Sequence, residues 1–248
     1  MKKQLIAVAI VLTVFGGLAA LMPQVSAESK FVGSERGNIT LAKDKTHNGS
    51  YYAAGQDIVI DGIVKGDVYC AGQSLKVNGT VEGDVICAAQ VIEINGTVQQ
   101  DVRLAGQFIT VSGSVGRTLT SFGQDVDLTR TATVGGDLNG AAQVLTIDGT
   151  VAKDLAFGSE TLKITGVVEG SARLTTDTLE LTSKPAIKGN LEYDGENRQE
   201  ISDKSVAGEV KFNQVAAGDN DEDVAGAILN AFLFLAAAMM ATAIIVAL

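Results

Sequence analysis

A strict repeat of 17 residues is the feature that most constrains how this chain can fold. Four consecutive units starting at Ala54 read AGQDIVIDGIVKGDVYC, AGQSLKVNGTVEGDVIC, AAQVIEINGTVQQDVRL and AGQFITVSGSVGRTLTS. Self-similarity at a fixed period is typical of solenoids, in which each unit packs only against its two neighbours. The body of the chain is therefore expected to be a stack of equivalent coils.

A glutamine marks the same place in successive units. Its spacing is 17 residues until the step from Gln124 to Gln143, which is 19 because residues 130–133 include two extra residues. Glu160 and Asp177 then continue the spacing of 17. In-register amides one coil apart can hydrogen-bond to one another, so the sequence predicts a structural ladder. Its members are Gln56, Gln73, Gln90, Gln107, Gln124 and Gln143.

Each unit shows the apolar alternation of short β-strands, interrupted by turns. In the first unit, Ile58 and Ile60 precede an Asp-Gly turn, and a single Val64 precedes a second turn at residues 65–67. Glycine is expected at these corners because it adopts left-handed backbone conformations freely. Three strands and three corners describe one triangular coil of a single-stranded parallel β-helix. A β-sandwich, the main alternative, would not need an invariant step.

The repeat can be followed over residues 39–212. Roughly ten coils at about 4.8 Å each make a rod about 50 Å long. Segments 39–47 and 194–201 depart from the pattern and are expected to cap the ends of the rod. Two apolar columns are predicted to fill the interior: Ile58, Leu75, Ile92, Ile109, Val126, Leu145, Leu162 and Leu179 in one, and Val68, Val85, Val102, Leu119, Leu138 and Leu155 in the other.

The N-terminal segment has the pattern of a signal peptide. Lys2 and Lys3 precede an apolar stretch, and residues 25–27 (Val-Ser-Ala) offer the small side chains that a signal peptidase requires. Residues 1–27 are therefore expected to direct export and to be removed, with an uncleaved anchor as the alternative. Residues 28–38 are expected to be a short linker before the β-helix.

The C-terminal segment has the pattern of a membrane anchor. An acidic linker, residues 213–223, precedes residues 224–248, which carry no charge. A helix of that length reaches about 37 Å, and the hydrocarbon core of a bilayer is about 30 Å thick. We expect a transmembrane helix with the β-helix on the extracytoplasmic side, and a buried amphipathic helix is the alternative. No Lys or Arg follows the apolar segment, so further membrane helices beyond Leu248 are also an open expectation.

Composition argues against several functional classes. The net charge is −10, whereas a nucleic-acid binder needs a basic face. The chain has one His and no Trp, and its turns are too short to carry a catalytic cluster. The 17-residue step also differs from the 18-residue coils of hexapeptide acyltransferases. We therefore expect a protein that is not an enzyme, binds no cofactor and has no small-molecule substrate. His47, at a position where other units have Val, is expected to be a core or capping residue.

One column of acidic residues is a candidate cation site. Thr118, Ser171 and Asn190 occupy equivalent positions in other units. Carboxylate oxygens repeated along a corner suit calcium, but Asp, Asn, Ser and Thr can all cap a turn by accepting a backbone N–H. Replacement by uncharged residues favours capping of each residue's own turn. The weak metal candidates are Asp67, Asp84, Asp101, Asp137 and Asp154.

The two cysteines, Cys70 and Cys87, are 17 residues apart and are expected to lie directly above each other. Export would permit a disulfide between them. Adjacent coils bring the Cα atoms within the range for a disulfide, although in-register Cβ atoms are slightly too far apart without strain. A disulfide and a stacked pair of buried thiols both remain open.

The units V-K-G-D-V at residues 64–68 and V-E-G-D-V at residues 81–85, with I-x-I-x-G between them, resemble the bactofilin, or polymer-forming cytoskeletal, family. The resemblance covers about residues 39–212. It implies a right-handed β-helix that polymerises end to end without a nucleotide and serves as a bacterial scaffold. Bactofilins are mostly cytoplasmic, so this chain is more similar to exported, membrane-bound relatives with G-D-V repeats.

The expected function is thus that of an exported, membrane-anchored scaffold of the bacterial envelope. The ends of the rod are sheet edges, so a homo-oligomer or polymer formed through these ends is the expected partner interaction. The alternative is an extracellular module that binds a glycan or a divalent cation on one face of the rod.

Overall fold

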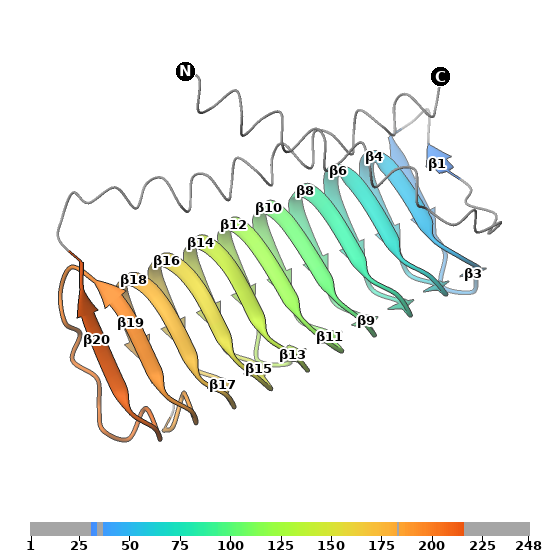
Figure 1. The fold of residues 1–248 in the computed structure, drawn as a ribbon. Coiled ribbons are helices and arrows are strands. Elements are labelled where there is room, and N and C mark those ends of the chain that lie inside the picture. The colour runs from blue at the N-terminus through green and yellow to red at the C-terminus, as the bar shows by residue number, and fades with distance from the viewer. Residues whose placement is uncertain (1–30, 34–36, 183, 216–248) are drawn as a thin grey trace, which may run out of the picture.

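The computed structural model describes residues 31–33, 37–182 and 184–215, which form a parallel β-solenoid (Figure 1). About ten coils of about 17 residues follow one another along the rod, as the repeat predicted. Within the described ranges the chain has no helix, and so none that is long and apolar enough to cross a membrane. The predicted signal peptide and membrane anchor, residues 1–27 and 224–248, lie outside the described residues.

Each regular coil consists of one long and one very short strand. The long strands have ten residues: β4 (Tyr51–Ile60), β6 (Val68–Val77), β8 (Val85–Ile94), β10 (Val102–Val111), β12 (Leu119–Leu128), β14 (Leu138–Ile147), β16 (Leu155–Ile164) and β18 (Ala172–Leu181). The short strands have two residues: β3 (Thr46–His47), β5 (Ile63–Val64), β7 (Thr80–Val81), β9 (Thr97–Val98), β11 (Ser114–Val115), β13 (Thr133–Val134), β15 (Thr150–Val151) and β17 (Val167–Val168).

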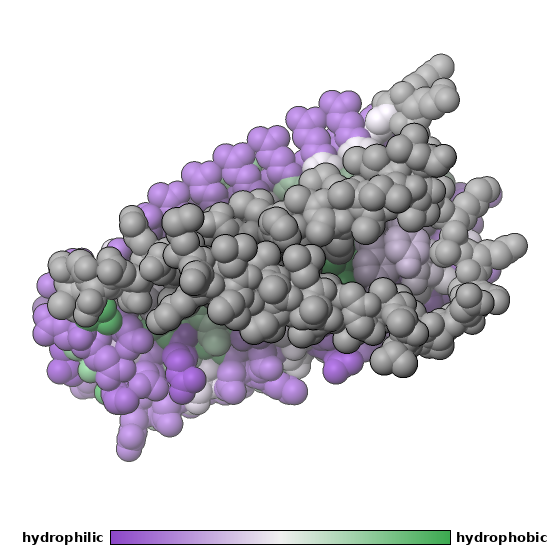
Figure 2. Space-filling model, turned by 45° about the horizontal axis from the view of Figure 1, so that its top comes forward, coloured by the Kyte–Doolittle hydropathy of each residue, from purple (hydrophilic) through white to green (hydrophobic). Residues whose placement is uncertain are grey.

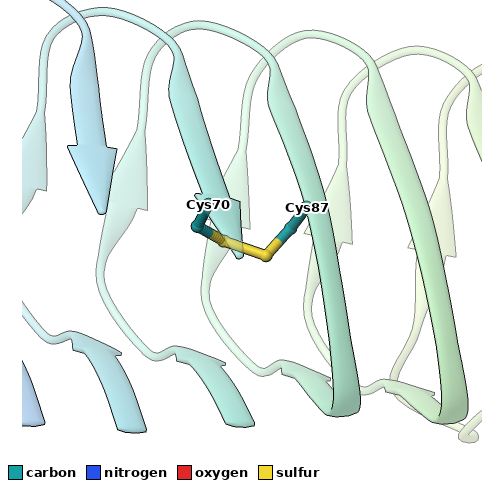
Figure 3. Close-up of a disulfide and its surroundings, with 2 residues drawn as sticks. All are labelled: Cys70 and Cys87. Atoms are coloured by element: carbon teal, nitrogen blue, oxygen red, sulfur yellow. A yellow bond between two sulfur atoms is a disulfide. The ribbon is translucent and has the colours of Figure 1, made fainter. Parts of the chain in front are cut away.

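Every strand pairs in parallel with the equivalent strand of the next coil. Val68 pairs with Val85 and Leu75 with Ile92, so the register is the 17-residue repeat itself. The sequence predicted three separate strands per coil, whereas two of them are continuous through the corner at Ala71-Gly72. The long strand forms two sides of the coil because its backbone bends at this corner. Figure 3 shows this bend in the second and third coils.

The apolar columns fill the interior as expected. Ile58, Leu75 and Ile92 in one column and Val68, Val85 and Val102 in the other are at most 1 % exposed. A third column, inside the two-residue strands, is equally buried and includes Val64, Val81, Val98, Val115, Val134, Val151 and Val168. Because each coil contributes only a few inward side chains, the rod depends on contacts between neighbouring coils.

Glycine is needed at the Asn-Gly and Asp-Gly corners for a reason other than the one expected. Among the described residues, only Gly37, Gly49 and Gly140 have a positive φ, so the left-handed conformation predicted for these corners was wrong. A Cβ on Gly79 would instead overlap the carbonyl oxygen of Gly62 in the preceding coil. The constraint is therefore the close approach of two backbones.

The two-residue insertion builds a wider version of the same corner. Ala132 takes the place of the corner glycine, and its N–H donates to the Thr129 carbonyl at 2.8 Å. The Thr131 hydroxyl donates to the Ser112 carbonyl of the preceding coil at 2.8 Å. The first coil has a corner of the same kind at residues 42–45, where the N–H of Lys45 donates to the carbonyl of Ala42 at 2.9 Å. A corner widened in this way accommodates a side chain where the narrow corner accepts only glycine.

The two ends of the rod differ from each other. At the N-terminal end, β2 (Asn38–Leu41) and β3 pair with the next coil, and the predicted irregularity of residues 39–47 is confined to the widened corner at residues 42–45. A further strand, β1 (Phe31–Gly33), lies within the predicted linker and pairs with β4. At the C-terminal end, β19 (Leu191–Gly195) and β20 (Val210–Gln214) continue the ladder, and residues 196–201 between them form no strand, which agrees with the predicted irregularity.

Replacing Gly79 with alanine tests the close approach at the corners. The added Cβ would meet the Gly62 carbonyl, and backbone cannot move aside as a flexible side chain can. We expect the free energy of unfolding in urea to fall by about 2 kcal/mol. The matched control is Gly158→Ala, where the nearest atom to an added Cβ is 3.9 Å away, and it should be close to neutral. Equal stability of both variants would contradict this explanation.

Candidate functional site

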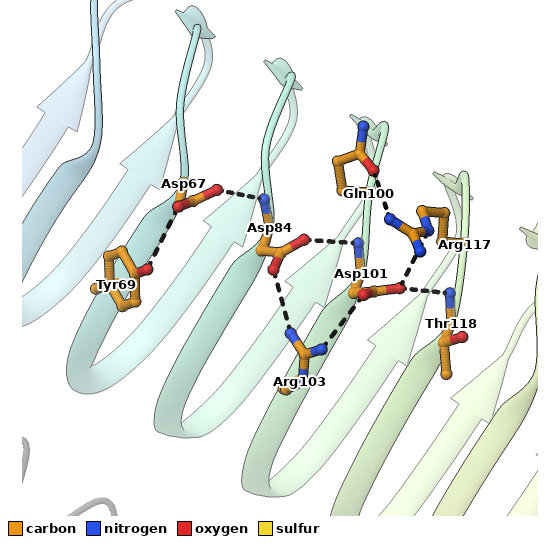
Figure 4. A network of polar contacts seen from close by, with 8 residues as sticks. All are labelled: Asp67, Tyr69, Asp84, Gln100, Asp101, Arg103, Arg117 and Thr118. Carbon is orange, nitrogen blue, oxygen red and sulfur yellow. Dashed lines mark hydrogen bonds and ion pairs between the residues drawn. The ribbon is translucent and has the colours of Figure 1, made fainter. Parts of the chain in front are cut away.

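The acidic column is the strongest candidate site from the sequence, and its carboxylates point along the rod toward the next coil (Figure 4). Asp67 Oδ1 accepts the backbone N–H of Asp84 at 2.9 Å. Asp84 Oδ1 accepts the N–H of Asp101 at 3.0 Å, and Asp101 Oδ1 accepts the N–H of Thr118 at 3.1 Å. Each aspartate therefore caps the corner of the coil that follows it.

The same arrangement recurs in the second half of the rod with other residue types. Asp137 Oδ1 accepts the N–H of Asp154 at 3.1 Å, and Asp154 Oδ1 accepts the N–H of Ser171 at 2.8 Å. The Ser171 hydroxyl and the Asn190 amide oxygen then accept the N–H groups of Asn190 and Glu209. The side chains do cap turns, as expected. The prediction that each caps its own turn was wrong, because the N–H that it accepts belongs to the next coil.

The remaining carboxylate oxygens of the first half are also used within the rod. Arg103 donates to Asp84 Oδ2 and to Asp101 Oδ2, both at 3.3 Å, and so bridges two coils (Figure 4). Arg117 lies 3.8 Å from Asp101 Oδ1 and donates to Gln100 at 3.1 Å. These cations offset the repulsion between carboxylates stacked one coil apart.

Tyr69 extends this network toward the N-terminal end. Its hydroxyl donates to Asp67 Oδ2 at 3.3 Å, and its ring stacks on Tyr52 with 5.0 Å between centroids. Burial and the neighbouring Asp67 carboxylate raise the pKa of Tyr69 to about 12. A raised pKa stabilises the fold below pH 10, and this contribution is lost as the pH rises from about 10 toward 12.

The carboxylates of the acidic column cap backbone N–H groups and form ion pairs with arginines. Within the part of the chain that the structure describes, no group of three or more His, Cys, Asp or Glu side chains is arranged to hold a metal ion. The capping oxygens point at N–H groups, which a cation would have to displace. The geometry thus favours the capping interpretation over the cation interpretation for Asp67, Asp84, Asp101, Asp137 and Asp154.

The predicted glutamine ladder forms in part: three of its five steps are hydrogen bonds between successive coils, and a fourth bond joins Gln143 to Glu160. Gln56 donates to Gln73 at 3.0 Å. Gln90 donates to Gln107 at 3.1 Å, and Gln107 donates to Gln124 at 3.0 Å. Beyond the widened corner, Gln143 donates to a carboxylate oxygen of Glu160 at 3.2 Å. All four bonds lie on the surface. Figure 2 shows hydrophilic residues in a regular row along one edge of the rod.

A second, unpredicted ladder of side-chain hydrogen bonds runs along the Asn-Gly corners. Asn78 donates to Asp61 at 2.7 Å, and Asn95 donates to Asn78 at 3.0 Å. An amide can accept from one coil and donate to another, so asparagine can continue the row that aspartate, which only accepts, begins. The 17-residue spacing of Asp61, Asn78 and Asn95 was the signal that could have revealed this ladder.

Cys70 and Cys87 form a disulfide between the second and third coils (Figure 3). Their Cα atoms are 4.6 Å apart, which is close to the spacing of paired strands and within the range of protein disulfides. Both residues are buried, at 8 % and 1 % exposure, in the inward column that continues with Leu104. Of the two alternatives left open by the sequence, the structure has the covalent bridge.

His47 lies at the N-terminal end of the column of inward valines, directly paired with Val64. Its Nε2 is 3.1 Å from the Ser50 carbonyl oxygen, and its ring meets the Tyr51 ring edge to face. The residue is half-buried and ends the apolar column with a polar side chain. This position agrees with the expected core or capping role.

Comparisons with models of protein families, with curated protein sequences and with solved structures found no match to this chain.

Substitution of Asp154 tests the capping role without disturbing an ion pair. Asp154→Ala removes the acceptor for the Ser171 N–H, so we expect the free energy of unfolding to fall by about 1 kcal/mol. Asp154→Asn keeps an acceptor oxygen, as Asn190 does natively, and should lose less than half of that.

Isothermal calorimetry on the same protein separates capping from cation binding. We expect no calcium binding that depends on this column, so the Asp84→Ala, Asp101→Ala variant should titrate like the unsubstituted chain. Binding that is present in the unsubstituted chain and absent in the variant would overturn the capping interpretation.

Removal of the disulfide is expected to destabilise the rod. The bridge closes a loop of 17 residues, and the chain-entropy estimate for such a loop is about 3 kcal/mol. The Cys70→Ala, Cys87→Ala variant should therefore unfold at lower urea concentration than the oxidised chain. The reduced unsubstituted chain is the control and should resemble the variant; identical stability of oxidised and reduced chains would contradict a stapling role.

Proposed function

We propose that the chain is a non-enzymatic scaffold of the bacterial envelope, exported, anchored in a membrane and self-associating end to end in the manner of bactofilins. In this proposal residues 1–27 direct export, residues 224–248 form the anchor, and the β-helix is right-handed. The disulfide between Cys70 and Cys87 supports an extracytoplasmic location, because disulfides persist mainly in oxidising compartments.

The observation that carries the proposal is the parallel ladder, which continues to a last strand with a free edge. In the described part of the chain, β20 pairs with β19 on one side and with no strand on the other. Val210, at the start of β20, is 41 % exposed although its column is buried elsewhere in the rod. An edge of this kind is a template for a further parallel strand.

The direction of the edge donors follows from the repeat. The Leu191 N–H donates to the Glu209 carbonyl in the next coil at 2.8 Å, as Val68 donates to Asp84. Val210 occupies the same column, so its N–H points away from β19 toward the position of the next coil. A second copy of the chain, aligned along the same axis, would supply the missing acceptor.

Substitution of this donor tests the proposal. Val210→Pro removes the outward N–H and leaves the bonds between β19 and β20 in place. We expect the full chain in mild detergent to form filaments many rods long that are visible by electron microscopy, and the variant to remain as single rods.

The control is Val210→Thr, which keeps the N–H and should assemble normally. If the unsubstituted chain shows only single rods at high protein concentration, the proposal of self-association is wrong. Equal assembly of the proline and threonine variants would show that the β20 edge is not the contact.

A further inference from the structure

The chain contains Asn-Gly dipeptides whose surroundings in the rod differ. In an Asn-Gly dipeptide the backbone nitrogen of glycine can attack the side-chain amide of asparagine, because glycine turns freely and has no side chain in the way. The surroundings of each dipeptide therefore decide whether this reaction occurs in the folded protein. The dipeptides are Asn48-Gly49, Asn78-Gly79, Asn95-Gly96 and Asn139-Gly140.

The corner at Asn78 holds both of its reacting groups in place. The N–H of Gly79 donates to the carbonyl of Ile60 at 2.9 Å, and the side-chain amide of Asn78 donates to Asp61 at 2.7 Å. Asn95 and its glycine are held in the same way by the preceding coil. These corners must open locally before the nitrogen can reach the side chain, and such openings of a paired backbone are infrequent.

The dipeptide Asn139-Gly140 is held inside the long strand β14. Both residues pair in parallel with β12 in the preceding coil and with β16 in the following coil. The peptide that joins them is therefore fixed by a neighbouring coil on each side, and it is also expected to react only after local opening.

The dipeptide Asn48-Gly49 has none of these constraints. It lies outside the strands, between β3 and β4, and Asn48 is exposed. Within the described residues, neither the side chain of Asn48 nor the N–H of Gly49 has a hydrogen-bond partner. In a later coil, the equivalent N–H of Gly83 donates to the carbonyl of Gly66 at 3.2 Å. Gly49 lacks such an acceptor because β3, at the end of the rod (Figure 1), is the edge strand of its sheet.

We propose that Asn48 is a site of spontaneous deamidation in the folded protein. The nitrogen of Gly49 forms a bond to Cγ of Asn48, the bond between Cγ and Nδ2 breaks, and the side-chain nitrogen leaves as ammonia with the hydrogen that Gly49 gives up. The product is a five-membered succinimide. Water then opens this ring at one carbonyl or the other, which gives aspartate or isoaspartate. The reaction consumes only water and needs no oxidant or reductant.

The isoaspartate product is expected to loosen the first coil, because its main chain contains one extra methylene group. The backbone of Gly49 lies so close to Gly66 in the next coil that a Cβ on Gly66 would be 2.5 Å from the carbonyl carbon of Gly49. Just before this corner, the N–H of Lys65 donates to the carbonyl of His47 at 2.9 Å. A longer main chain does not fit this spacing, so the modification weakens the end of the rod at β3. This proposal is independent of the proposed scaffold function.

Peptide mass spectrometry of the full chain in mild detergent tests the proposal. During incubation at mildly alkaline pH, the folded chain should deamidate at Asn48 about tenfold faster than at Asn78 or Asn95, because those corners react only when they open. In concentrated urea the rates should converge, since all the sites share the Asn-Gly sequence. Equal rates at the three sites in the folded chain, or no reaction at Asn48, would overturn the proposal.

Hydrogen exchange of the same samples tests the structural consequence. The N–H of Lys65 should exchange faster in the incubated chain than in the fresh chain. The Asn48→Gln variant, whose longer side chain cyclises far more slowly, should keep its protection on incubation. Fresh Asn48→Asp adds the charge without the methylene group and should also be protected. A deamidated chain that still protects the Lys65 N–H, or a fresh Asn48→Asp chain that has lost this protection, would contradict the role given to isoaspartate.

Discussion

Parallel backbone pairing between coils about 4.8 Å apart is the constraint on which the rest of the structure depends. Val68 lies over Val85 and Leu75 over Ile92, so a residue has as its neighbour the residue 17 positions away, or 19 across a widened corner. The chemistry of each column must therefore be compatible with itself. Identical apolar residues stack easily inside. In a polar or charged outer column, identical side chains also lie next to one another, so each needs a hydrogen-bond partner and like charges repel.

The outer columns solve this problem in different ways. Glutamine and asparagine carry both a donor and an acceptor, so Gln90 can bond to Gln107 and Asn95 to Asn78. Aspartate carries only acceptors when ionised, so Asp84 bonds to the N–H of Asp101 and shares Arg103 with it. Lys76 and Glu93 alternate in sign and pair at 2.8 Å. These arrangements account for the conspicuous polar patterns of the sequence as parts of the rod.

The sequence predicted what the repeat determines directly. The coil, the buried columns and the stacking of Cys70 on Cys87 all follow from a period of 17 and an alternation of apolar residues. Predictions that required three-dimensional distances were less successful. The corner glycines were assigned to a left-handed backbone, whereas Gly79 is required because the Gly62 carbonyl lies too close for a Cβ. The aspartate caps were assigned to their own turns because the sequence does not reveal which N–H is nearest.

Fibre diffraction or cryo-electron microscopy of the assembled full chain tests the central claim most directly, since the claim is that one parallel ladder continues from coil to coil and from molecule to molecule. The account predicts a repeat of about 4.8 Å along the filament axis that is uninterrupted at the junction between β20 of one copy and the first coil of the next. Filaments with strands aligned along their axis, or with rods joined only side by side, would contradict it.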